Sequence, residues 1–342
     1  MEMKFYPYTL ELIHPFGIST NTRTTTPVVL VEIKHDDITG YGEASLPPYL
    51  KETQDSVISF LRKVDLSGYS SMDDYKATIE SLEKIETGNY AAKAAVDIAL
   101  HDLYGKFHNR SISAMLNPQN NVMSLTSFTI GIDTEEVLKQ KISEADEYKI
   151  LKIKLGKGDD KKVIDLIRRF TDKPLYVDIN RGWMDVDYAV SLSNWLFEKG
   201  VVLIEQPFPV EMVDETKKLT KESPVPVIAD EAVQRSADIS KLHDVYSGIN
   251  IKLMKSGGLL EAQKMIQAAK EYDMKIMIGC MTETSCAVTA ASALACFTDF
   301  ADLDGNLLIK NDPFTGVKVY NGKLIMPGFP GIVQRKRNKQ EL

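Results

Sequence analysis

The stretch Ile150-Leu151-Lys152-Ile153-Lys154-Leu155-Gly156 decides how the rest of the chain is interpreted. Its alternation of polar and apolar residues predicts a β-strand with Lys152 and Lys154 on one face. The segments that follow predict a buried parallel sheet, in which that face is not simply solvated. Two ammonium groups side by side repel each other, so the neutral form of one becomes more accessible, and such a lysine can act as a general base. On this stretch alone, an exposed edge strand with solvated lysines stays open.

Short apolar segments recur at regular intervals on either side of this strand. They follow one another at steps of about 22 to 28 residues, the length of one strand plus one crossover helix. Eight such strands predict an α/β fold with a closed parallel barrel. The alternative, an open doubly wound sheet, needs a glycine-rich phosphate turn after its first strand, and the sequence has none there. The expected strands are 125–130, 150–155, 175–179, 201–205, 227–230, 249–253, 275–279 and 300–304.

The first 120 or so residues have a different pattern, in which strands precede helices. Residues 28–33 and Gly40-Tyr41-Gly42-Glu43-Ala44 predict two strands joined by a turn at Asp36-Asp37. The Thr-rich stretch 17–26 has the composition of a mobile flap between the first strands. Helical patterning follows from about residue 53 to residue 107. We therefore expect an α+β capping domain over residues 1–122, completed by the tail 311–342, and a barrel over residues 123–310.

The composition limits the classes of function. A chain of 342 residues with 44% hydrophobic and 26% charged residues is ordinary for a soluble globular enzyme. The net charge of −7 argues against nucleic-acid binding. The three cysteines, Cys280, Cys286 and Cys296, are an odd number clustered late in the chain, which is not a disulfide framework and indicates a reducing compartment, and we expect them as small core residues. Without a signal-peptide pattern or an apolar span, we expect a cytoplasmic protein with no membrane partner, and a homo-oligomer stays open.

Carboxylates end three successive predicted strands, at Asp178, Glu205 and Asp230. In a parallel barrel these ends meet at one mouth, where function resides. Three ionised carboxylates there would repel one another strongly unless a cation lay between them. A site of oxygens alone points to Mg²⁺, and no histidine ends a strand, which argues against zinc.

Taken together, the motifs resemble a known family. Lys-x-Lys, Asp-x-Asn, Glu-Gln-Pro, Ala-Asp-Glu and Lys-x-x-Lys-x-Gly-Gly resemble those of the muconate-lactonizing subgroup of the enolase superfamily, over essentially the whole chain. The resemblance implies an α+β capping domain on a modified (β/α)₇β barrel that binds Mg²⁺. The roles it implies are Asp178, Glu205 and Asp230 as metal ligands, Lys154 and Lys252 as acid/base residues on opposite faces of the substrate, and Lys152 as electrostatic partner of Lys154.

That arrangement has a physical rationale. A proton next to a carboxylate is too weakly acidic for an amine to remove unaided, and Mg²⁺ stabilises the enediolate charge as it develops. With a lysine on each face, a proton removed on one side is returned on the other, which is racemisation or epimerisation. Lys255 lies off the strand face and is expected to be a helix-entry residue.

The last predicted strand discriminates among members of the subgroup. Asp302 and Asp304 resemble the Asp-x-Asp pair of dipeptide epimerases, which receives the substrate's α-ammonium group. Arg23 in the Thr-rich stretch is the candidate cation for a side-chain carboxylate. Further residues are expected to face the substrate, although the run 282–284 can equally cap the next helix. They are Thr129, Thr282 and Glu283.

We therefore expect a Mg²⁺-dependent dipeptide epimerase that inverts the α-carbon of the C-terminal residue by two-lysine 1,1-proton transfer through an enediolate. The favoured substrate is an L-Ala-D/L-Glu dipeptide from cell-wall peptide turnover. Within the subgroup, the alternatives are epimerases of hydrophobic or Pro-containing dipeptides, muconate cycloisomerase and o-succinylbenzoate synthase. A Schiff-base aldolase and a non-catalytic barrel serving as a binding protein are alternatives of other classes.

Overall fold

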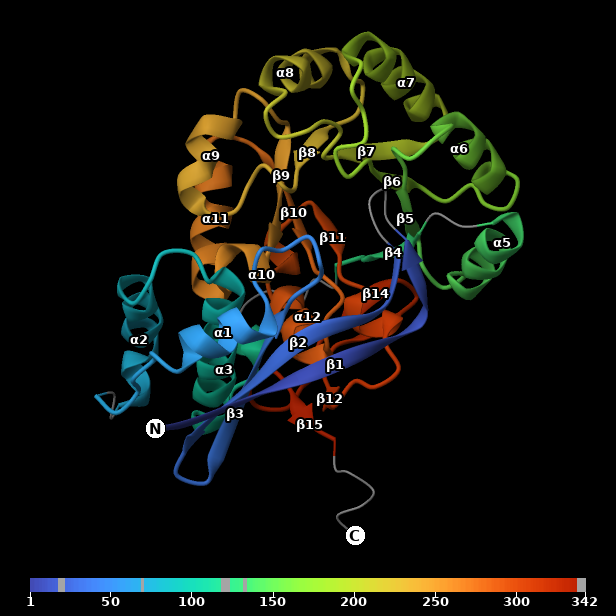
Figure 1. The fold of residues 1–342 in the computed structure, drawn as a ribbon. Helices are drawn as coiled ribbons and strands as arrows, with labels where there is room; N and C mark the ends of the chain where they lie inside the picture. The colour runs from blue at the N-terminus through green and yellow to red at the C-terminus, as the bar shows by residue number, and fades with distance from the viewer. Residues whose placement is uncertain (18–21, 69–70, 118–123, 132–133, 337–342) are drawn as a thin grey trace.

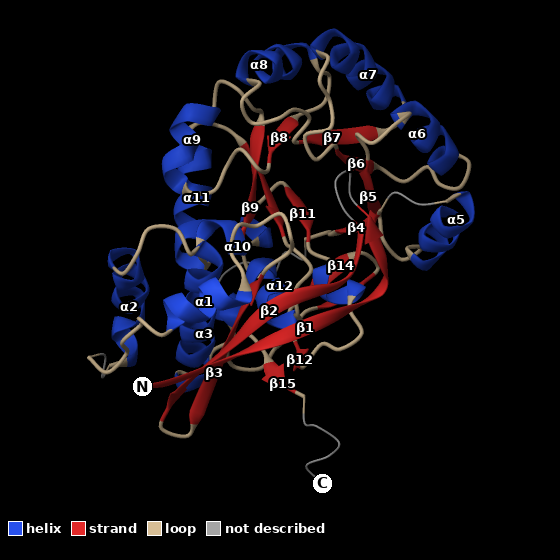
Figure 2. Ribbon diagram, viewed as in Figure 1, coloured by secondary structure: helices blue, strands red, loops and turns tan. Residues whose placement is uncertain are grey.

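A computed structural model describes residues 1–17, 22–68, 71–117, 124–131 and 134–336 of the chain. Eight parallel strands form one sheet in the order of the chain, and helices surround it (Figures 1 and 2). Hydrogen bonds from Ser127 Oγ to Asp302 Oδ1 and from the Leu303 amide to Thr126 Oγ1, both 2.8 Å, join the last strand to the first. The predicted barrel is thereby confirmed. Its strands are β4 (Ser127–Ile130), β5 (Ile150–Lys154), β6 (Leu175–Asp178), β7 (Val201–Glu205), β8 (Val227–Ala229), β9 (Gly248–Lys252), β10 (Lys275–Gly279) and β11 (Phe300–Asp302).

The strand register brings the polar strand ends to one level. Lys154 of β5 pairs with Asp178 of β6, which in turn pairs with Glu205 of β7. On the other side of the barrel, Gly279 of β10 pairs with both Lys252 and Asp302. Because parallel strands end at a common edge, the charged residues converge at the carboxyl-terminal mouth.

The helices between the strands begin where capping residues satisfy their first amides. The Asp159 side chain accepts from the Lys162 amide, and the Asp185 side chain accepts from the Tyr188 amide, so each caps its helix. In chain order the barrel helices are α5 (Glu135–Glu144), α6 (Asp160–Arg168), α7 (Val186–Glu198), α8 (Val213–Glu222), α9 (Ser236–Leu242), α10 (Leu253–Ser256), α11 (Leu259–Glu271) and α12 (Ser285–Ser292).

The N-terminal region forms an antiparallel sheet packed on helices, beside the barrel mouth (Figure 1). Its alanine-rich helix α3 lies directly against β3, and a Cβ atom at Gly42 would collide with the Ala95 carbonyl. Close packing of this kind requires glycine at position 42. The elements are β1 (Glu2–Gly17), β2 (Thr22–His35), β3 (Ile38–Ser45), α1 (Gln54–Leu61), α2 (Tyr75–Ser81), α3 (Tyr90–Phe107) and α4 (Ile112–Leu116).

The C-terminal segment packs against the N-terminal region. The buried Asp102 side chain in α3 accepts hydrogen bonds from the Ile332 and Val333 amides. An isolated bridge also joins Leu12 to Ile309. The segment contains β12 (Phe314–Thr315), β13 (Lys318–Tyr320), β14 (Lys323–Ile325) and β15 (Gln334–Arg335), and 3₁₀ turns elsewhere in the chain span Met72–Asp74, Leu82–Lys84, Ala295–Phe297 and Gly305–Leu308.

The prediction of a flap over residues 17–26 is partly wrong. Residues 22–26 belong to β2, where Thr25 and Thr26 pair with Glu11 and Leu10 of β1. Threonine is β-branched and favours strands, so a Thr-rich stretch continues the hairpin. Residues 18–21 of the predicted flap lie outside the described residues.

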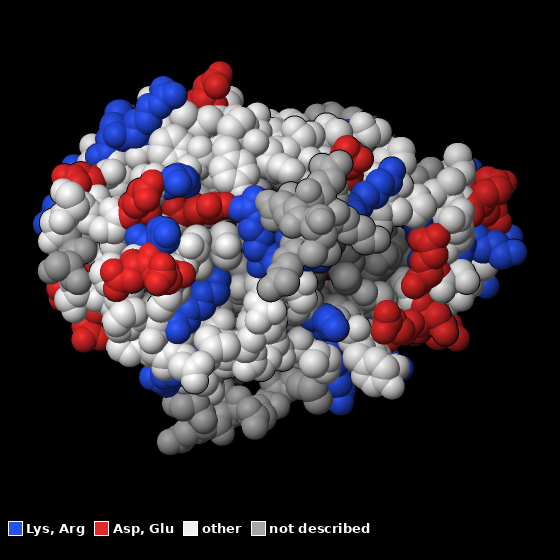
Figure 3. Space-filling model, turned by 90° about the horizontal axis from the view of Figure 1, so that it is seen from below, with Lys and Arg blue, Asp and Glu red and all other residues white. Residues whose placement is uncertain are grey.

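Basic and acidic side chains are interspersed on the face shown in Figure 3. The described parts of the chain contain no helix that combines the length and the apolar character needed to cross a bilayer.

Candidate active site

A cavity of about 420 Å³ lies at the barrel mouth. The barrel contributes Lys152, Lys154 and Lys252 to its wall, and the N-terminal region contributes Arg23 and Tyr49. The cavity is therefore shared between the two parts of the chain, and all four expected cationic side chains line it.

Lys152 lies at the centre of the charge network. Its buried ammonium is 2.6 Å from Glu205 Oε2 and 2.7 Å from Asp302 Oδ2. A third carboxylate oxygen, Asp178 Oδ2, lies 3.2 Å away. Lys152 thus joins the acids of three different strands.

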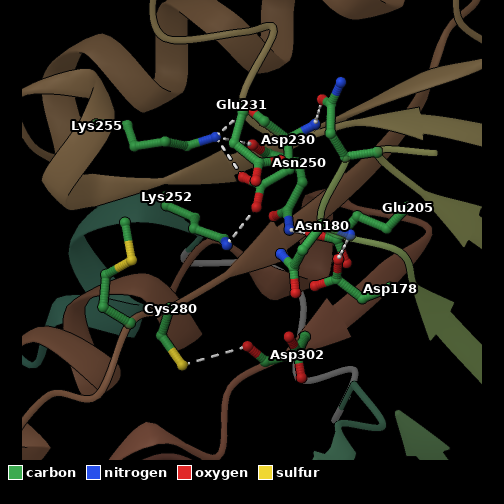
Figure 4. A network of polar contacts seen from close by, with 12 residues as sticks. Asp178, Asn180, Glu205, Asp230, Glu231, Asn250, Lys252, Lys255, Cys280 and Asp302 are labelled. Carbon is green, nitrogen blue, oxygen red and sulfur yellow. Dashed lines mark hydrogen bonds and ion pairs between the residues drawn. The ribbon is translucent and has the colours of Figure 1, made fainter. Parts of the chain in front are cut away.

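Lys154 and Lys252 reach the cavity from different sides of the barrel. Lys154 Nζ donates to Asp178 Oδ2 at 2.6 Å, and Lys252 Nζ donates to Asp230 Oδ2 at 2.7 Å (Figure 4 for Lys252). The strands that carry them, β5 and β9, are separated in the sheet by β6, β7 and β8. The amines therefore face a common space from separate walls.

The expected lowering of a lysine pKa by repulsion between Lys152 and Lys154 is not found at Lys152. Burial lowers the pKa of Lys152, but Asp302 and Glu205 raise it well above the usual value. Burial likewise lowers the pKa of Lys252, and Asp230 raises it well above its ordinary range. The reason is geometric, because each ammonium contacts carboxylates rather than the other ammonium.

Lys255 was expected at a helix entry, and it does lie in the short helix α10. Its buried side chain, however, turns back to Asp230, where Nζ donates to the carboxylate Oδ1 and to the backbone carbonyl (Figure 4). Asp230 therefore has one carboxylate oxygen on Lys252 and the other on Lys255. These contacts hold its pKa well below the usual range even though burial opposes ionisation.

Sequence reasoning missed two further residues that fix the acids. Asn250 Nδ2 donates to Glu205 Oε1 at 2.7 Å (Figure 4). Buried Gln206 has a positive φ of 38° and accepts from the Asp230 amide at 2.9 Å. Such backbone strain is typical of sites where the surroundings enforce a geometry. Asn250 could have been found by alternation, since it shares the strand face of Lys252.

The donor set fits a hard divalent cation in chemistry. Asp178, Glu205 and Asp230 are buried carboxylates at neighbouring strand ends, and the set contains neither His nor Cys. Glu205 Oε2 accepts no aligned hydrogen bond from any described residue, and its ionic partner is the Lys152 ammonium at 2.6 Å. Within the described ranges no three His, Cys, Asp or Glu side chains are grouped so that they could hold a metal ion, and Lys152, Lys154 and Lys252 pair with these acids.

Asp302 and Asp304 lie together at the end of β11, and both line the cavity. Burial opposes ionisation of Asp302, but Lys152 holds its pKa below the usual value. Burial and the neighbouring Asp302 raise the pKa of Asp304 to about 7. The Thr129 amide donates to Asp304 Oδ2 at 2.6 Å, so the pair is fixed from β4. An acidic pair of this kind is complementary to an ammonium group.

The predicted substrate-facing residues are only partly brought together. Arg23 lines the cavity, donates to Thr282 Oγ1 at 2.8 Å and lies 5.9 Å from the Tyr49 ring centre. Thr129 and Thr282 line the cavity as well, whereas Glu283 turns back to accept from the Met281 amide at 2.9 Å.

Two predictions about neighbouring residues have different outcomes. Thr284 caps α12 by accepting from the Cys286 amide, one of the two alternatives for the run 282–284. Cys280, expected in the core, lines the cavity and contacts the Asp302 carbonyl (Figure 4), whereas Cys286 is buried as expected.

Comparisons with known proteins agree with this fold. Residues 135–332 match the enolase C-terminal domain-like family, and residues 4–117 match the N-terminal domain family of mandelate racemase and muconate lactonizing enzyme. The chain belongs to the enolase superfamily.

Within the superfamily, several of the similar proteins are dipeptide epimerases. The L-Ala-D/L-Glu epimerase of Bacteroides thetaiotaomicron is 50% identical, over 97% of this chain and 87% of that protein. The substrate-liganded L-Ala-D/L-Glu epimerase of Bacillus subtilis superposes with a TM-score of 0.90 at 28% identity, over 97% of this chain and 98% of that one. Dipeptide epimerase from Cytophaga hutchinsonii, complexed with Mg and D-Ala-L-Val, has a TM-score of 0.89 at 25% identity, over 99% of this chain and 96% of that one.

Proposed function

We propose that the chain is a dipeptide epimerase that inverts the α-carbon of the C-terminal residue of an L-Ala-D/L-Glu dipeptide. The observation that carries the proposal is the placement of Lys154 and Lys252 on separate walls of one cavity. A lysine on one face of the substrate removes the α-proton, and the lysine on the other face returns a proton with inverted configuration. The similarity to L-Ala-D/L-Glu epimerases over nearly the whole chain supports this reaction.

We propose Asp178, Glu205 and Asp230 as the residues that hold Mg²⁺. When bound, the cation would stabilise the negative charge that develops on the substrate carboxylate as the α-proton leaves. The side chains around it have separate tasks. Asn250 orients Glu205, and Lys255 orients Asp230. The positive charge of Lys152 compensates the negative charge of Glu205.

The acidic pair Asp302 and Asp304 selects a substrate with a free amino terminus. Asp302 and Asp304 would accept the α-ammonium group, and this contact holds the dipeptide at a fixed distance from Lys154 and Lys252. Muconate and o-succinylbenzoate have no ammonium group, so a buried acidic pair disfavours them as substrates.

Arg23 is the residue proposed to recognise a side-chain carboxylate. Its guanidinium group lies in the cavity wall beside Thr282, and burial lowers its pKa below the ordinary arginine value. A partly buried guanidinium gains from a charged partner, which favours a glutamate side chain over a hydrophobic one. As inferred from the sequence, we propose that the enzyme takes part in the turnover of cell-wall peptides in the cytoplasm.

Solvent deuterium exchange tests the proposal. L-Ala-L-Glu and L-Ala-D-Glu are each incubated with the protein and Mg²⁺ in D₂O, and deuterium at the glutamate α-carbon is followed by mass spectrometry and NMR. Both epimers are expected to exchange and interconvert, and EDTA is expected to stop both processes. Epimerisation without deuterium entry contradicts the two-lysine route, and trapping of a ketone substrate by borohydride would instead indicate a Schiff-base aldolase.

A further inference from the structure

Lys252 stands immediately before a sharp change of chain direction, residues 253–258, which we call the elbow. The elbow consists of the short helix α10 followed by Gly257 and Gly258, after which α11 begins. Strand pairing with β10 fixes the Lys252 backbone on one side. The position of the Lys252 ammonium therefore depends on what holds the other side of the elbow.

A buried aspartate of the N-terminal region holds that side. Asp97, in α3, accepts from the Leu259 amide through Oδ1 at 2.8 Å and from the Leu260 amide through Oδ2 at 3.1 Å. These are the first amides of α11, a helix of 13 residues. Both oxygens of one carboxylate thus cap a barrel helix from a different part of the chain.

The elbow is built to receive this carboxylate. Gly258 is the N-cap of α11 and has no side chain with which to satisfy the amides. A Cβ atom at Gly258 would collide with the Asp97 carboxyl group, and the φ of +118° is open only to glycine. The Ser45 amide also donates to Met254 Sδ at 3.2 Å, so the N-terminal region contacts the elbow at a second point.

We propose that Asp97 is a positioning residue for Lys252. Its hydrogen bonds to the Leu259 and Leu260 amides fix the end of the elbow that is distant from Lys252. Asp97 thereby fixes the distance from the Lys252 amine to the substrate α-carbon without contacting the substrate. The inference rests on the proposed function, because it assigns a part in one of the two proton transfers. It also explains the Gly-Gly pair in the motif Lys-x-x-Lys-x-Gly-Gly, which admits the Asp97 carboxylate.

Asp102 provides a matched control in the same helix. Like Asp97 it is fully buried and accepts backbone amide hydrogen bonds, but its donors are the amides of Tyr41, Ile332 and Val333 and the Lys106 ammonium rather than the elbow. Asp97→Asn and Asp102→Asn each replace one acceptor oxygen by an amide NH2 group, which donates hydrogen bonds and cannot accept one from a backbone N–H. Both variants are therefore expected to lose stability, and only the first disturbs the elbow.

The test compares α-proton exchange from each epimer in D₂O for the wild type, Asp97→Asn, Asp102→Asn and Lys252→Ala. Lys252→Ala identifies the epimer whose proton Lys252 removes. For that epimer, Asp97→Asn is expected to lower the exchange kcat by about 10- to 100-fold, because a small misplacement of a reacting group has an effect of that order. The KM and the exchange of the other epimer change less than about threefold, and Asp102→Asn leaves both epimers near wild-type rates.

Several outcomes would overturn the inference. An equal loss for both epimers in Asp97→Asn indicates a purely structural role, and unchanged exchange removes any role. If Asp97→Asn does not fold, Asp97→Ser retains a side-chain oxygen that can accept from one amide, and it must give a smaller loss confined to the same epimer.

A readout that needs no substrate separates this inference from the proposed function. Amide hydrogen exchange at Leu259 and Leu260 is expected to quicken in Asp97→Asn and not in Asp102→Asn. If the exchange rates of the Leu259 and Leu260 amides are unchanged in Asp97→Asn, Asp97 does not hold the elbow and the inference is refuted. A wild type that exchanges no dipeptide refutes the proposed function, whatever the amides show.

Discussion

Glu43 offers a quantitative test of how the N-terminal region is joined to the barrel. It is fully buried in β3 and accepts from the Thr284 amide at 3.0 Å and from the Thr284 hydroxyl. Burial, together with the nearby Glu283, raises the pKa of Glu43 from 4.5 to about 8. The folded protein therefore holds a proton at Glu43 that the unfolded chain releases at lower pH.

The sign and size of the effect follow from linkage. A carboxyl group with a raised folded-state pKa contributes stability that is fully present below the unfolded pKa and is lost as pH rises through the folded pKa. Each unit of pKa shift corresponds to about 1.4 kcal/mol. As pH rises from about 5 to about 8, the titration of Glu43 is therefore expected to lower the free energy of unfolding by about 3 kcal/mol. Glu43→Gln cannot titrate and lacks this loss.

The assay is urea unfolding of the wild type and Glu43→Gln across that pH range. Near pH 5 the variant is expected to be about 1 kcal/mol less stable, because its amide makes one poorer hydrogen bond with Thr284. Near pH 8 it is expected to be more stable than the wild type, so the two curves cross. A difference in unfolding free energy that stays constant with pH refutes the burial of a protonated Glu43.

Three further predictions concern the site. The pKa of Asp304, about 7, predicts that kcat/KM for L-Ala-Glu falls up to about tenfold per pH unit below pH 7, because the carboxylate is protonated there. Asp304→Asn is expected to abolish this decrease at low pH. An unchanged pH profile in the variant would show that Asp304 does not cause it. Arg23→Met is expected to raise the KM for L-Ala-Glu about 10- to 100-fold and to change the KM for L-Ala-Leu little, and equal effects on both would exclude a contact with the side-chain carboxylate. Asn250→Leu is expected to weaken Mg²⁺ binding, measured by calorimetry, about 10- to 100-fold through loss of the contact with Glu205, and wild-type affinity would show that this hydrogen bond does not orient a ligand.

The barrel was predictable because its determinants are local and periodic. Each strand is a short apolar run at a constant spacing, and parallel strands end at one edge, so polar residues such as Asp178 and Glu205 had to converge. Strand ends were less predictable: β11 ends at Asp302, two residues before the expected end. A terminal polar residue fits the strand pattern and the following turn equally well.

The rest depends on contacts between distant segments. Lys255 follows a strand but turns into a helix, so strand alternation gives no indication that it contacts Asp230. The high pKa of Lys152 comes from three carboxylates on three strands, whose distances no local pattern determines. Asp97 is separated by 162 residues from the Leu259 amide that donates to it, and helical patterning alone gives no indication of this contact.

The central claim is that Lys154 and Lys252 work on opposite faces of one α-carbon. The most direct measurement follows deuterium entry into each epimer of L-Ala-Glu by NMR, with Mg²⁺, in Lys154→Ala and in Lys252→Ala. Neither variant is expected to epimerise, and each is expected to exchange the α-proton of a single epimer, a different one in each variant. Epimerisation at the wild-type rate in either variant, or retention of the same epimer's exchange in both, would contradict the account.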